Sequence, residues 1–178
     1  MKLTILPDQK LRQRSQEVIL PISDEDQRII DEMIEYVDSS QLEGSTLRPG
    51  IGIAAVQLGY LKRMFYIHVE YAPNKIFRDV IINPVKIGES ETYAALSNGE
   101  GCLSVAEEAN GQEGLVHRKN RVIIKGYSYF NKKEMEFDVN NFLAIVFQHE
   151  YDHLDGKLFI DRINKKDKNT PLKGEILI

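Results

Sequence analysis

The chain has 178 residues, of which 42% are hydrophobic and 28% are charged. This length is sufficient for one domain with its own core, and the ordinary globular composition excludes a disordered or collagen-like chain and disfavours a coiled coil. Lysine and arginine number 23 against 27 acidic residues, which gives a formal net charge of −4. This charge disfavours a protein whose main task is to bind nucleic acid.

The cysteine content and the apolar patterning bear on the compartment. Cys102 is the single cysteine and has no partner for an intramolecular disulfide, which is typical of the reducing cytosol. No apolar run approaches the roughly 18 residues that a membrane span requires. The apolar stretch within residues 1–7 is too short for a signal peptide. We therefore expect a cytoplasmic protein without a membrane partner.

The first predicted element is a helix over residues 24–38. Ser23 followed by Asp26 is typical of a helix start, and acidic residues in the first turn suit the positive end of a helix. The apolar residues that then recur at helical spacing are Ile29, Ile30, Met33, Ile34 and Val37. We expect this stripe to face the core rather than a cofactor.

The rest of the chain is predicted to contain five strands, a second helix and a short final strand. The strands are expected over residues 63–69, 79–83, 85–93, 120–130 and 134–139, with turns at 74–75, at Gly88 and at 131–133. The second helix is expected to run from Asn140 or Asn141 to about Asp155, with Gly156 as its stop. Residues 175–178 are expected to form an edge strand.

The order of these elements indicates the fold class. No internal repeat or linker divides the chain, and strands precede a helix without regular βαβ alternation. This pattern favours an α+β fold in which mostly antiparallel sheets pack around a central second helix. We expect one catalytic domain over residues 1–178.

Residues 149–153 read His-Glu-Tyr-Asp-His and fit the H-E-x-x-H pattern. On a helix, His149 and His153 lie on one face with Cβ atoms about 5–6 Å apart, so both imidazoles can bind one metal ion. Glu150 lies about 100° around the helix from His149, where it is better placed to act on water than to bind the metal. The pattern therefore predicts a hydrolytic metal site.

A catalytic metal site also requires a third protein ligand and an open position. Beyond His153 the chain contains no further His or Cys, so the carboxylate of Glu175 is one candidate. Cys102 is another, because a thiolate and two imidazoles form a tetrahedral site with one position free. The alternative is that Cys102 is a small buried side chain.

Three strings occur in order along the chain: GIGIAAVQ at 50–57, EGCLS at 100–104 and QHEYDHLDG at 148–156. They resemble the three signatures of the peptide deformylase family, G-x-G-x-A-A-x-Q, E-G-C-L-S and Q-H-E-x-D-H. The first two strings are separated by 42 residues, and the sequence ends 25 residues after His153. Both features resemble the longer-insert, strand-ended branch of that family.

The resemblance implies a metal-dependent hydrolase that removes the N-formyl group from the initiator methionine of nascent polypeptides and releases formate. It implies Cys102, His149 and His153 as metal ligands and Glu150 as the general acid and base. The family is generally taken to use Fe(II), and Zn, Ni or Co are possible substitutes. The implied partners are formyl-methionyl nascent peptides and, transiently, the ribosome, without a specific nucleic acid.

The resemblance also implies roles around the substrate. The Gln57 amide and the backbone N–H of Leu103 would stabilise the oxyanion that forms from the formyl group. Apart from the resemblance, Glu100 and Arg118 are expected either to pair behind the cysteine loop or to be two surface charges. The implied substrate-binding residues are Gly50, Ile51, Gly52 and Gly101 along the peptide backbone, and Phe142, Ile145 and Val146 around the methionine side chain.

Two other functions compete with this interpretation. A zincin-like metallopeptidase would bind its metal through Glu175 instead of Cys102. A catalytically inactive module would bind formylated or methionyl N-termini without turnover, although the intact Glu150 argues against it.

Three further residues have no assigned role. Asp152 would either orient a ligand histidine or face solvent. Neither His68 nor His117 matches a motif, and both are expected to be structural or exposed.

Overall fold

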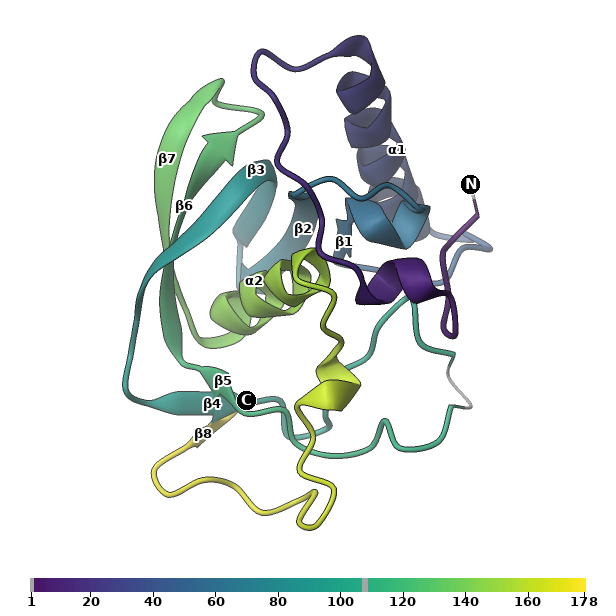
Figure 1. The fold of residues 1–178 in the computed structure, drawn as a ribbon. Helices are drawn as coiled ribbons and strands as arrows, with labels where there is room; N and C mark the ends of the chain where they lie inside the picture. Colours follow the sequence, from purple (N-terminus) through teal and green to yellow (C-terminus); the bar gives the residue numbers. More distant parts are fainter. Residues whose placement is uncertain (1, 107–108) are drawn as a thin grey trace.

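The computed structural model describes residues 2–106 and 109–178, which form two sheets around a central helix (Figure 1). The first sheet has the strand order β1-β2-β3-β6-β7 and is antiparallel throughout. Its strands are β1 (Gly52–Ala54), β2 (Met64–Ala72), β3 (Lys75–Glu89), β6 (Arg121–Ser128) and β7 (Lys133–Asn140). The second sheet has the order β5-β4-β8 and consists of β4 (Tyr93–Ala95), β5 (Arg118–Lys119) and β8 (Ile176–Leu177). The predicted α+β class is confirmed.

The predicted first helix is α1 (Asp24–Ser40). The Ser23 side chain accepts a hydrogen bond from the Asp26 backbone N–H, so Ser23 caps the helix as its sequence indicated. Most of the predicted apolar stripe is buried against β1 and β2, and Ile34 is only partly buried. α1 therefore covers one face of the larger sheet through its apolar side.

The predicted second helix is α2 (Asn141–Leu154), which contacts strands of both sheets. Figure 1 shows it between the two sheets. Phe147 packs edge-to-face against Phe65 and Phe77 of the larger sheet and anchors the helix in the core. Gly156 has a positive φ of 69°, and a Cβ there would lie 2.5 Å from the Arg12 carbonyl oxygen. Only glycine fits this helix stop, as predicted.

The prediction of two strands over 79–83 and 85–93 with a turn at Gly88 is wrong. β3 is one strand that runs from Lys75 to Glu89 through Gly88, and its pairing with β6 is irregular between Ile82 and Val85 and between Lys86 and Gly88. A Cβ at Gly88 would lie 3.2 Å from Ile123 of β6, so the glycine allows a close approach of two strands rather than a turn. The short β1 was not predicted.

The other turns and the final strand agree with the sequence. Asn74 has a positive φ of 60° in the turn between β2 and β3, and Lys132 has a φ of 54° in the turn between β6 and β7. β8 pairs in parallel with β4 at the edge of the smaller sheet. Smaller 3-10 turns are η1 (Gln9–Arg12), η2 (Ala55–Leu58) and η3 (Phe159–Asp161).

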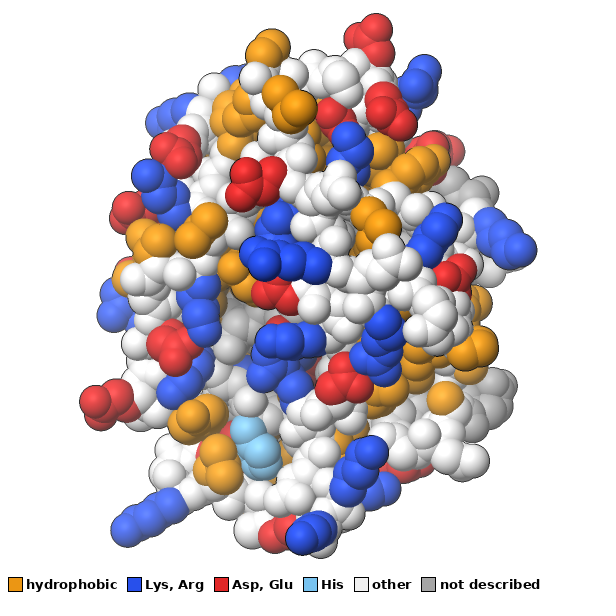
Figure 2. All heavy atoms as spheres, viewed as in Figure 1, with side chains coloured by type: hydrophobic (Ala, Val, Ile, Leu, Met, Phe, Trp, Pro, Cys, Tyr) orange, Lys and Arg blue, Asp and Glu red, His pale blue; other side chains and the backbone are white. Residues whose placement is uncertain are grey.

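The helices and the face of the molecule in view bear on membrane association and on charge. Among the described residues, no helix is both long enough and apolar enough to cross a membrane. Figure 2 shows basic and acidic side chains interspersed over the face in view.

Candidate active site

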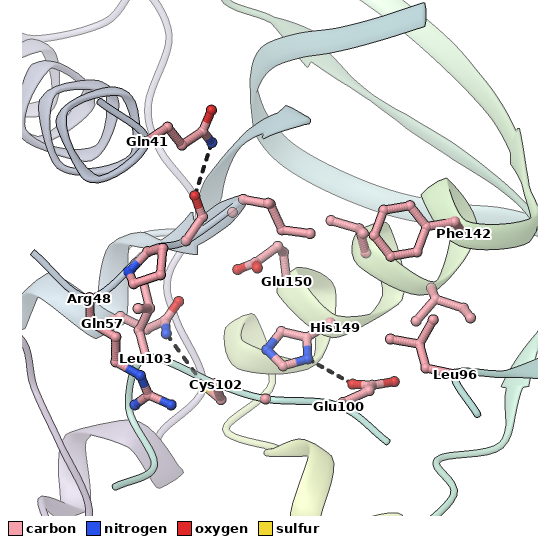
Figure 3. Close-up of a pocket in the computed structure, with 17 residues that line it drawn as sticks. Gln41, Arg48, Gln57, Leu96, Glu100, Cys102, Leu103, Phe142, His149 and Glu150 are labelled. Atoms are coloured by element: carbon pink, nitrogen blue, oxygen red, sulfur yellow. Dashed lines mark hydrogen bonds and ion pairs between the residues drawn. The ribbon is translucent and has the colours of Figure 1, made fainter. Parts of the chain in front are cut away.

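A cavity of about 420 Å³ opens beside α2 (Figure 3). Its walls come from the end of α1, the segment that leads into β1, η2, the loop after β4 and one face of α2. The lining residues are Gln41, Arg48, Pro49, Gly50, Ile51, Gly52, Gln57, Leu96, Glu100, Gly101, Cys102, Leu103, Phe142, Ile145, Val146, His149 and Glu150. The cavity thus brings all three strings of the sequence to one place.

Three possible metal ligands lie close together, two of them, Cys102 and His149, in the cavity lining and the third, His153, buried behind it. Within the described residues, one cluster of metal-binding type occurs, Cys102, His149 and His153, whose donor atoms all lie within 4.8 Å of one another. The Nε2 atom of His153 lies 3.4 Å from the Sγ atom of Cys102. A thiolate with two imidazoles suits Zn, Fe, Ni or Co and leaves one tetrahedral position open. The donor set therefore fits a catalytic divalent metal.

The protonation states of this group also suit a metal. Burial raises the pKa of the Cys102 thiol, but His153 and His149 outweigh burial and hold that pKa well below its ordinary value of 9.0. Burial lowers the pKa of His149, but Cys102 and Glu100 outweigh it and raise that pKa well above 6.5. A thiolate beside an imidazolium is a site where a divalent cation can replace a proton.

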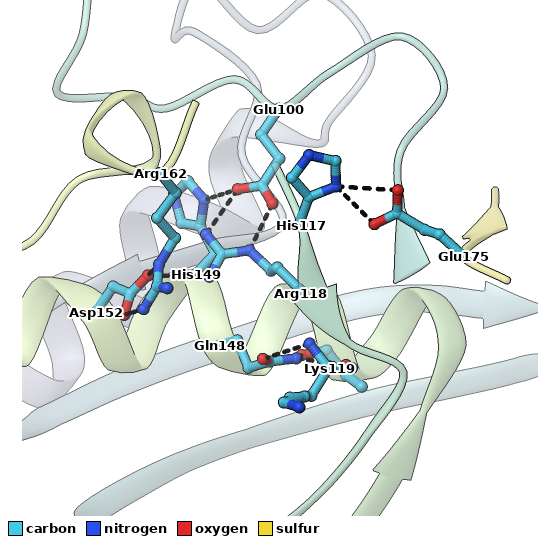
Figure 4. A network of polar contacts seen from close by, with 10 residues as sticks. Glu100, His117, Arg118, Lys119, Gln148, His149, Asp152, Arg162 and Glu175 are labelled. Carbon is cyan, nitrogen blue, oxygen red and sulfur yellow. Dashed lines mark hydrogen bonds and ion pairs between the residues drawn. The ribbon is translucent and has the colours of Figure 1, made fainter. Parts of the chain in front are cut away.

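A buried ionic network orients the first histidine of the motif (Figure 4). The Glu100 carboxylate binds Nδ1 of His149 at 2.8 Å and accepts two hydrogen bonds from Arg118, at 2.5 and 2.9 Å. Burial raises the pKa of Glu100, but Arg118 and His149 together hold it at about 2. Because Nδ1 is occupied by the carboxylate, Nε2 of His149 is the nitrogen available to a metal.

The same arginine connects this network to the far side of α2. Arg118 donates to Asp152 at 2.9 Å, and Asp152 accepts two hydrogen bonds from Arg162, at 2.5 and 2.6 Å. Asp152 therefore neither orients a histidine nor faces solvent, the two options that the sequence left open. It helps to compensate the charge of a buried arginine.

Glu150 is 4% exposed and lies beside His149 at the cavity wall (Figure 3). Among the described residues its Oε2 atom has no hydrogen-bond partner. Burial is the main cause that raises its pKa above the ordinary 4.5. Gly52 of β1 leaves the room for this carboxylate, since a Cβ at position 52 would lie 2.6 Å from Oε1. A carboxylate whose pKa is raised is a stronger base than an exposed one, and this suits a group that takes up and returns a proton.

The Gln57 amide is fixed at both ends. Its Oε1 atom accepts a hydrogen bond from the Ala54 backbone N–H at 2.8 Å, and its Nε2 atom donates to the Ser104 hydroxyl at 3.2 Å. Nε2 also lies 3.6 Å from Sγ of Cys102. The amide N–H groups are therefore aimed at the metal-ligand side of the cavity, with Leu103 on the adjoining wall.

Four lining residues that the sequence did not reveal are Gln41, Arg48, Pro49 and Leu96. Gln41 donates to the Gly50 carbonyl at 3.0 Å, and Arg48 donates to the Val105 carbonyl at 2.7 Å. Gln41 and Leu96 stand outside any motif, so only the fold brings them here. Arg48 lies two residues before the first string, and that proximity was the available signal.

The remaining histidines and Glu175 lie outside the cavity lining. Nδ1 of His117 contacts both carboxylate oxygens of Glu175, at 2.8 and 2.9 Å, so Glu175 is engaged away from the metal-ligand group. Nδ1 of His68 lies 2.7 Å from the Asp38 carboxylate. The metallopeptidase alternative required Glu175 as a ligand, and the structure does not place it there.

Comparisons with known proteins agree with this geometry. The family model of polypeptide deformylases matches residues 1–169. The chain belongs to the polypeptide deformylase family. It is 46% identical to a peptide deformylase of Mycoplasmopsis pulmonis, with 93% of this chain and 91% of the relative covered, and 42% identical to peptide deformylase 2 of Bacillus anthracis, with 90% and 87% covered.

Solved deformylase structures share the fold. Peptide deformylase from Ehrlichia chaffeensis in complex with actinonin matches with a TM-score of 0.76 at 28% identity, covering 93% of this chain and 90% of that one. Deformylase from Thermotoga maritima matches with a TM-score of 0.72 at 28% identity, covering 92% and 97%. The chain is thus an enzyme of a metal-dependent family that removes the N-formyl group from formylmethionyl peptides, and its described residues include a Cys/His/His group that could hold a metal ion.

Proposed function

We propose that this deformylase acts co-translationally on the initiator methionine of nascent polypeptides and releases formate, with residues 1–178 as one catalytic domain. The observation that carries the proposal is a buried Glu150 beside the ligand group, whose Oε2 atom has no hydrogen-bond partner in the described part of the chain. The proposed partners are formyl-methionyl peptides and, transiently, the ribosome. Because nascent chains emerge in the cytoplasm, the proposed reaction takes place there.

Cys102, His149 and His153 are the proposed metal ligands, and Fe(II) is the proposed native metal. Zn, Ni and Co suit the same donors, and affinity alone does not select among them. When bound, such a metal supplies Lewis acidity and lowers the pKa of water from about 15.7 toward about 7. Glu100 supports the site by holding His149 through Nδ1.

Glu150 is the proposed proton carrier. It takes a proton from the attacking water and later donates it to the departing amine nitrogen of the methionine. The raised pKa of Glu150 supports both steps, because the carboxyl group must be a base first and an acid afterwards. Its unpaired oxygen and its position beside the ligand group leave it free to reach the reacting atoms.

Gln57 and Leu103 are the proposed oxyanion-stabilising groups. The Gln57 amide is held in place by Ala54 and Ser104, so little reorganisation is required when negative charge develops on the formyl oxygen. The backbone N–H of Leu103 would be the second donor. A formyl carbon bears only hydrogen, so a closely walled centre admits formamides and excludes bulkier acyl groups.

The rest of the cavity is proposed to bind the peptide. Phe142, Ile145 and Val146 lie on the α2 wall and provide an apolar surface for the methionine side chain. The proposed path of the peptide backbone is lined by Gly50, Ile51 and Gly52, which lead into β1, and by Gly101 of the cysteine loop. A Cβ at Gly50 would lie 2.9 Å from the Leu103 side chain, so the first glycine allows this wall to close up against the cysteine loop.

Formate release from a formyl-Met dipeptide tests the proposal. The protein is loaded with Fe(II) under anaerobic conditions, and Glu150→Gln and Cys102→Ala are measured in parallel. We expect turnover by the wild type, retained metal without turnover in Glu150→Gln, and loss of metal in Cys102→Ala. Absence of formate from folded, metal-loaded wild type would refute the proposal, and metal retained by Cys102→Ala would refute the ligand assignment.

A further inference from the structure

Glu175 is a fully buried carboxylate near the end of the chain, beyond the residues 1–169 that the family model matches. Its two oxygens contact Nδ1 of His117, and Oε2 also accepts a hydrogen bond from the Leu172 backbone N–H at 2.9 Å. Burying a carboxylate costs free energy unless hydrogen bonds and an adequate partner compensate for it. These contacts therefore fasten the C-terminal tail, defined here as residues 172–178.

The other side chains of the tail contribute little buried apolar contact. Ile176, Leu177 and Ile178 are 42%, 47% and 39% exposed, so only part of their apolar surface is removed from water. The carboxylate contact with His117 is the deeply buried side-chain anchor of the tail. We therefore expect the tail to detach when that contact is removed.

The backbone of the tail leads directly to the substrate cavity. β8 pairs with β4, and beyond β8 the Ile178 N–H donates to the Ala95 carbonyl at 2.9 Å while the Ser97 N–H donates to the Ile178 carbonyl at 2.8 Å. These two hydrogen bonds lie on either side of Leu96, which lines the cavity. The tail therefore fixes the backbone position of one wall residue.

His117 connects the tail to the polar network of the site. It immediately precedes Arg118 of β5, whose side chain holds Glu100, and Figure 4 shows the two contacts side by side. The smaller sheet thus carries the tail on one edge and the arginine of the ligand network on the other. A displaced tail would leave this network in place while releasing β4 on one side.

We propose that Glu175 is a positioning residue that sets the size selectivity of the substrate pocket. It does so by binding the tail to His117, which fixes the position of Leu96. This inference rests on the proposed deformylation. Leu96 lines the cavity on the same side as Phe142, which is proposed to contact the methionine side chain (Figure 3). When the contact between Glu175 and His117 is removed, Leu96 becomes free to move. The pocket then binds a methionine side chain less tightly and accepts bulkier side chains more readily.

The test compares Glu175→Ala with two other variants of the tail. Lys173→Ala changes an exposed residue in the same segment and serves as the matched control, and Glu175→Gln keeps the shape and an acceptor oxygen. Each metal-loaded protein is assayed for formate release from formyl-Met and formyl-Phe peptides. Release of the last residues by a carboxypeptidase is measured separately and reports tail detachment independently of catalysis.

For Glu175→Ala we expect faster release of the C-terminal residues and a KM for the formyl-Met peptide about three- to tenfold higher, with kcat nearly unchanged. The ratio of kcat/KM for formyl-Phe over formyl-Met should rise by a similar factor. Lys173→Ala should match the wild type, and Glu175→Gln should recover most of the selectivity. Metal content should be equal in all four proteins.

An unchanged selectivity ratio in Glu175→Ala would overturn the inference, whether or not the tail is released. A fall in kcat with loss of metal would also overturn it, because Glu175 would then support the site as a whole rather than the pocket wall. Failure of the wild type to release formate would instead refute the proposed function itself. The two failures are therefore distinguishable.

Discussion

Glu150 has room at the cavity wall because residue 52 of β1 has no side chain. A Cβ there would lie 2.6 Å from Oε1 and 3.0 Å from Cδ of Glu150, so an alanine must displace the carboxylate. General acid–base catalysis contributes about 10²–10⁴-fold in rate. We expect Gly52→Ala to lower kcat by about 10²-fold with the metal retained, measured by formate release and metal analysis.

Gly88→Ala is the matched control for this substitution. Gly88 also lies in a strand of the larger sheet, and a Cβ there would lie 3.2 Å from the movable Cδ1 of Ile123 and at an ordinary contact distance of 3.5 Å from its Cβ and Cγ1. Its formate release should stay within about twofold of the wild type, since surface-side strand changes of this kind have small effects. Equal losses of formate release in the two variants would show that replacing a strand glycine disturbs the sheet in general. The loss in Gly52→Ala would then not be caused by displacement of Glu150.

A second prediction at this scale concerns the Gln57 amide. Removal of one oxyanion donor typically costs about 10²–10³-fold in kcat. We expect Gln57→Ala to show a loss of that size with little change in metal content, because no metal ligand is removed. Gln27→Ala, which alters a glutamine on α1, should retain wild-type turnover. A Gln57→Ala protein with normal kcat would contradict the oxyanion role.

The elements that the sequence predicts well are those whose signal is local. α1 and α2 follow from helical periodicity, a serine cap and a glycine stop, all within a few residues of each helix. The predicted division of β3 is wrong because Gly88 resembles a turn residue locally, and only the pairing with the neighbouring β6 shows that it lies within one irregular strand. Local patterns carry no information about strand partners.

The site follows the same rule. The second and third strings indicate Cys102, His149 and His153 as candidate metal ligands, because the motif residues are contiguous within each string. The contact between His117 and Glu175 joins residues 58 positions apart without a motif, and it could not be predicted. From the residues alone, either Cys102 or Glu175 could be the third metal ligand. The number of residues between Cys102 and the histidines does not tell how close they lie in the folded chain.

At the scale of elements, Asp38 connects the end of α1 to two strands. Its carboxylate accepts hydrogen bonds from Tyr66 of β2 and Arg78 of β3, both at 2.7 Å, and lies 2.7 Å from Nδ1 of His68. Burial raises the pKa of Asp38, but hydrogen bonds from Tyr66, His68 and Arg78 outweigh burial and hold it below 3.8. Ionised Asp38 therefore stabilises the contact between the helix and the sheet.

This pKa shift predicts a dependence of stability on pH. A depressed folded-state pKa contributes stability that is fully present above the unfolded value of about 3.9 and is lost as the pH falls through the folded value. We expect Asp38→Asn to lower the free energy of unfolding by about 1–3 kcal/mol at pH 7 and to differ less from the wild type near pH 3. Urea unfolding at both pH values measures the difference.

Asp31→Asn provides the control for the pH prediction. Asp31 lies on the same helix, accepts one exposed hydrogen bond from Gln27 and takes no part in the contact with β2 and β3. Its effect should be below about 0.5 kcal/mol at both pH values. A constant difference between Asp38→Asn and the wild type from pH 7 to pH 3 would contradict the assigned charge effect.

At the scale of the whole molecule, the ligand group joins parts of the chain that pack in separate apolar clusters. Cys102 packs with Leu158 and Phe159 behind α2, whereas the helix that carries both histidines packs through Phe147 against the larger sheet. A metal bound by all three ligands would therefore connect these clusters in the folded state. The unfolded chain offers no such preformed site, so metal binding should stabilise the folded protein.

The size of this stabilisation can be predicted. A ligand present at 100 times its Kd adds about 2.7 kcal/mol, and 1 kcal/mol shifts the Tm of a chain this long by about 2–4 °C, so we expect chelation to lower the Tm by about 5–10 °C. Differential scanning calorimetry with and without a chelator measures the shift. Cys102→Ala should show little response, because two imidazoles alone bind the metal more weakly. A wild type that is insensitive to chelation, despite a verified loss of metal, would show that the ligand group contributes to chemistry but not to folding.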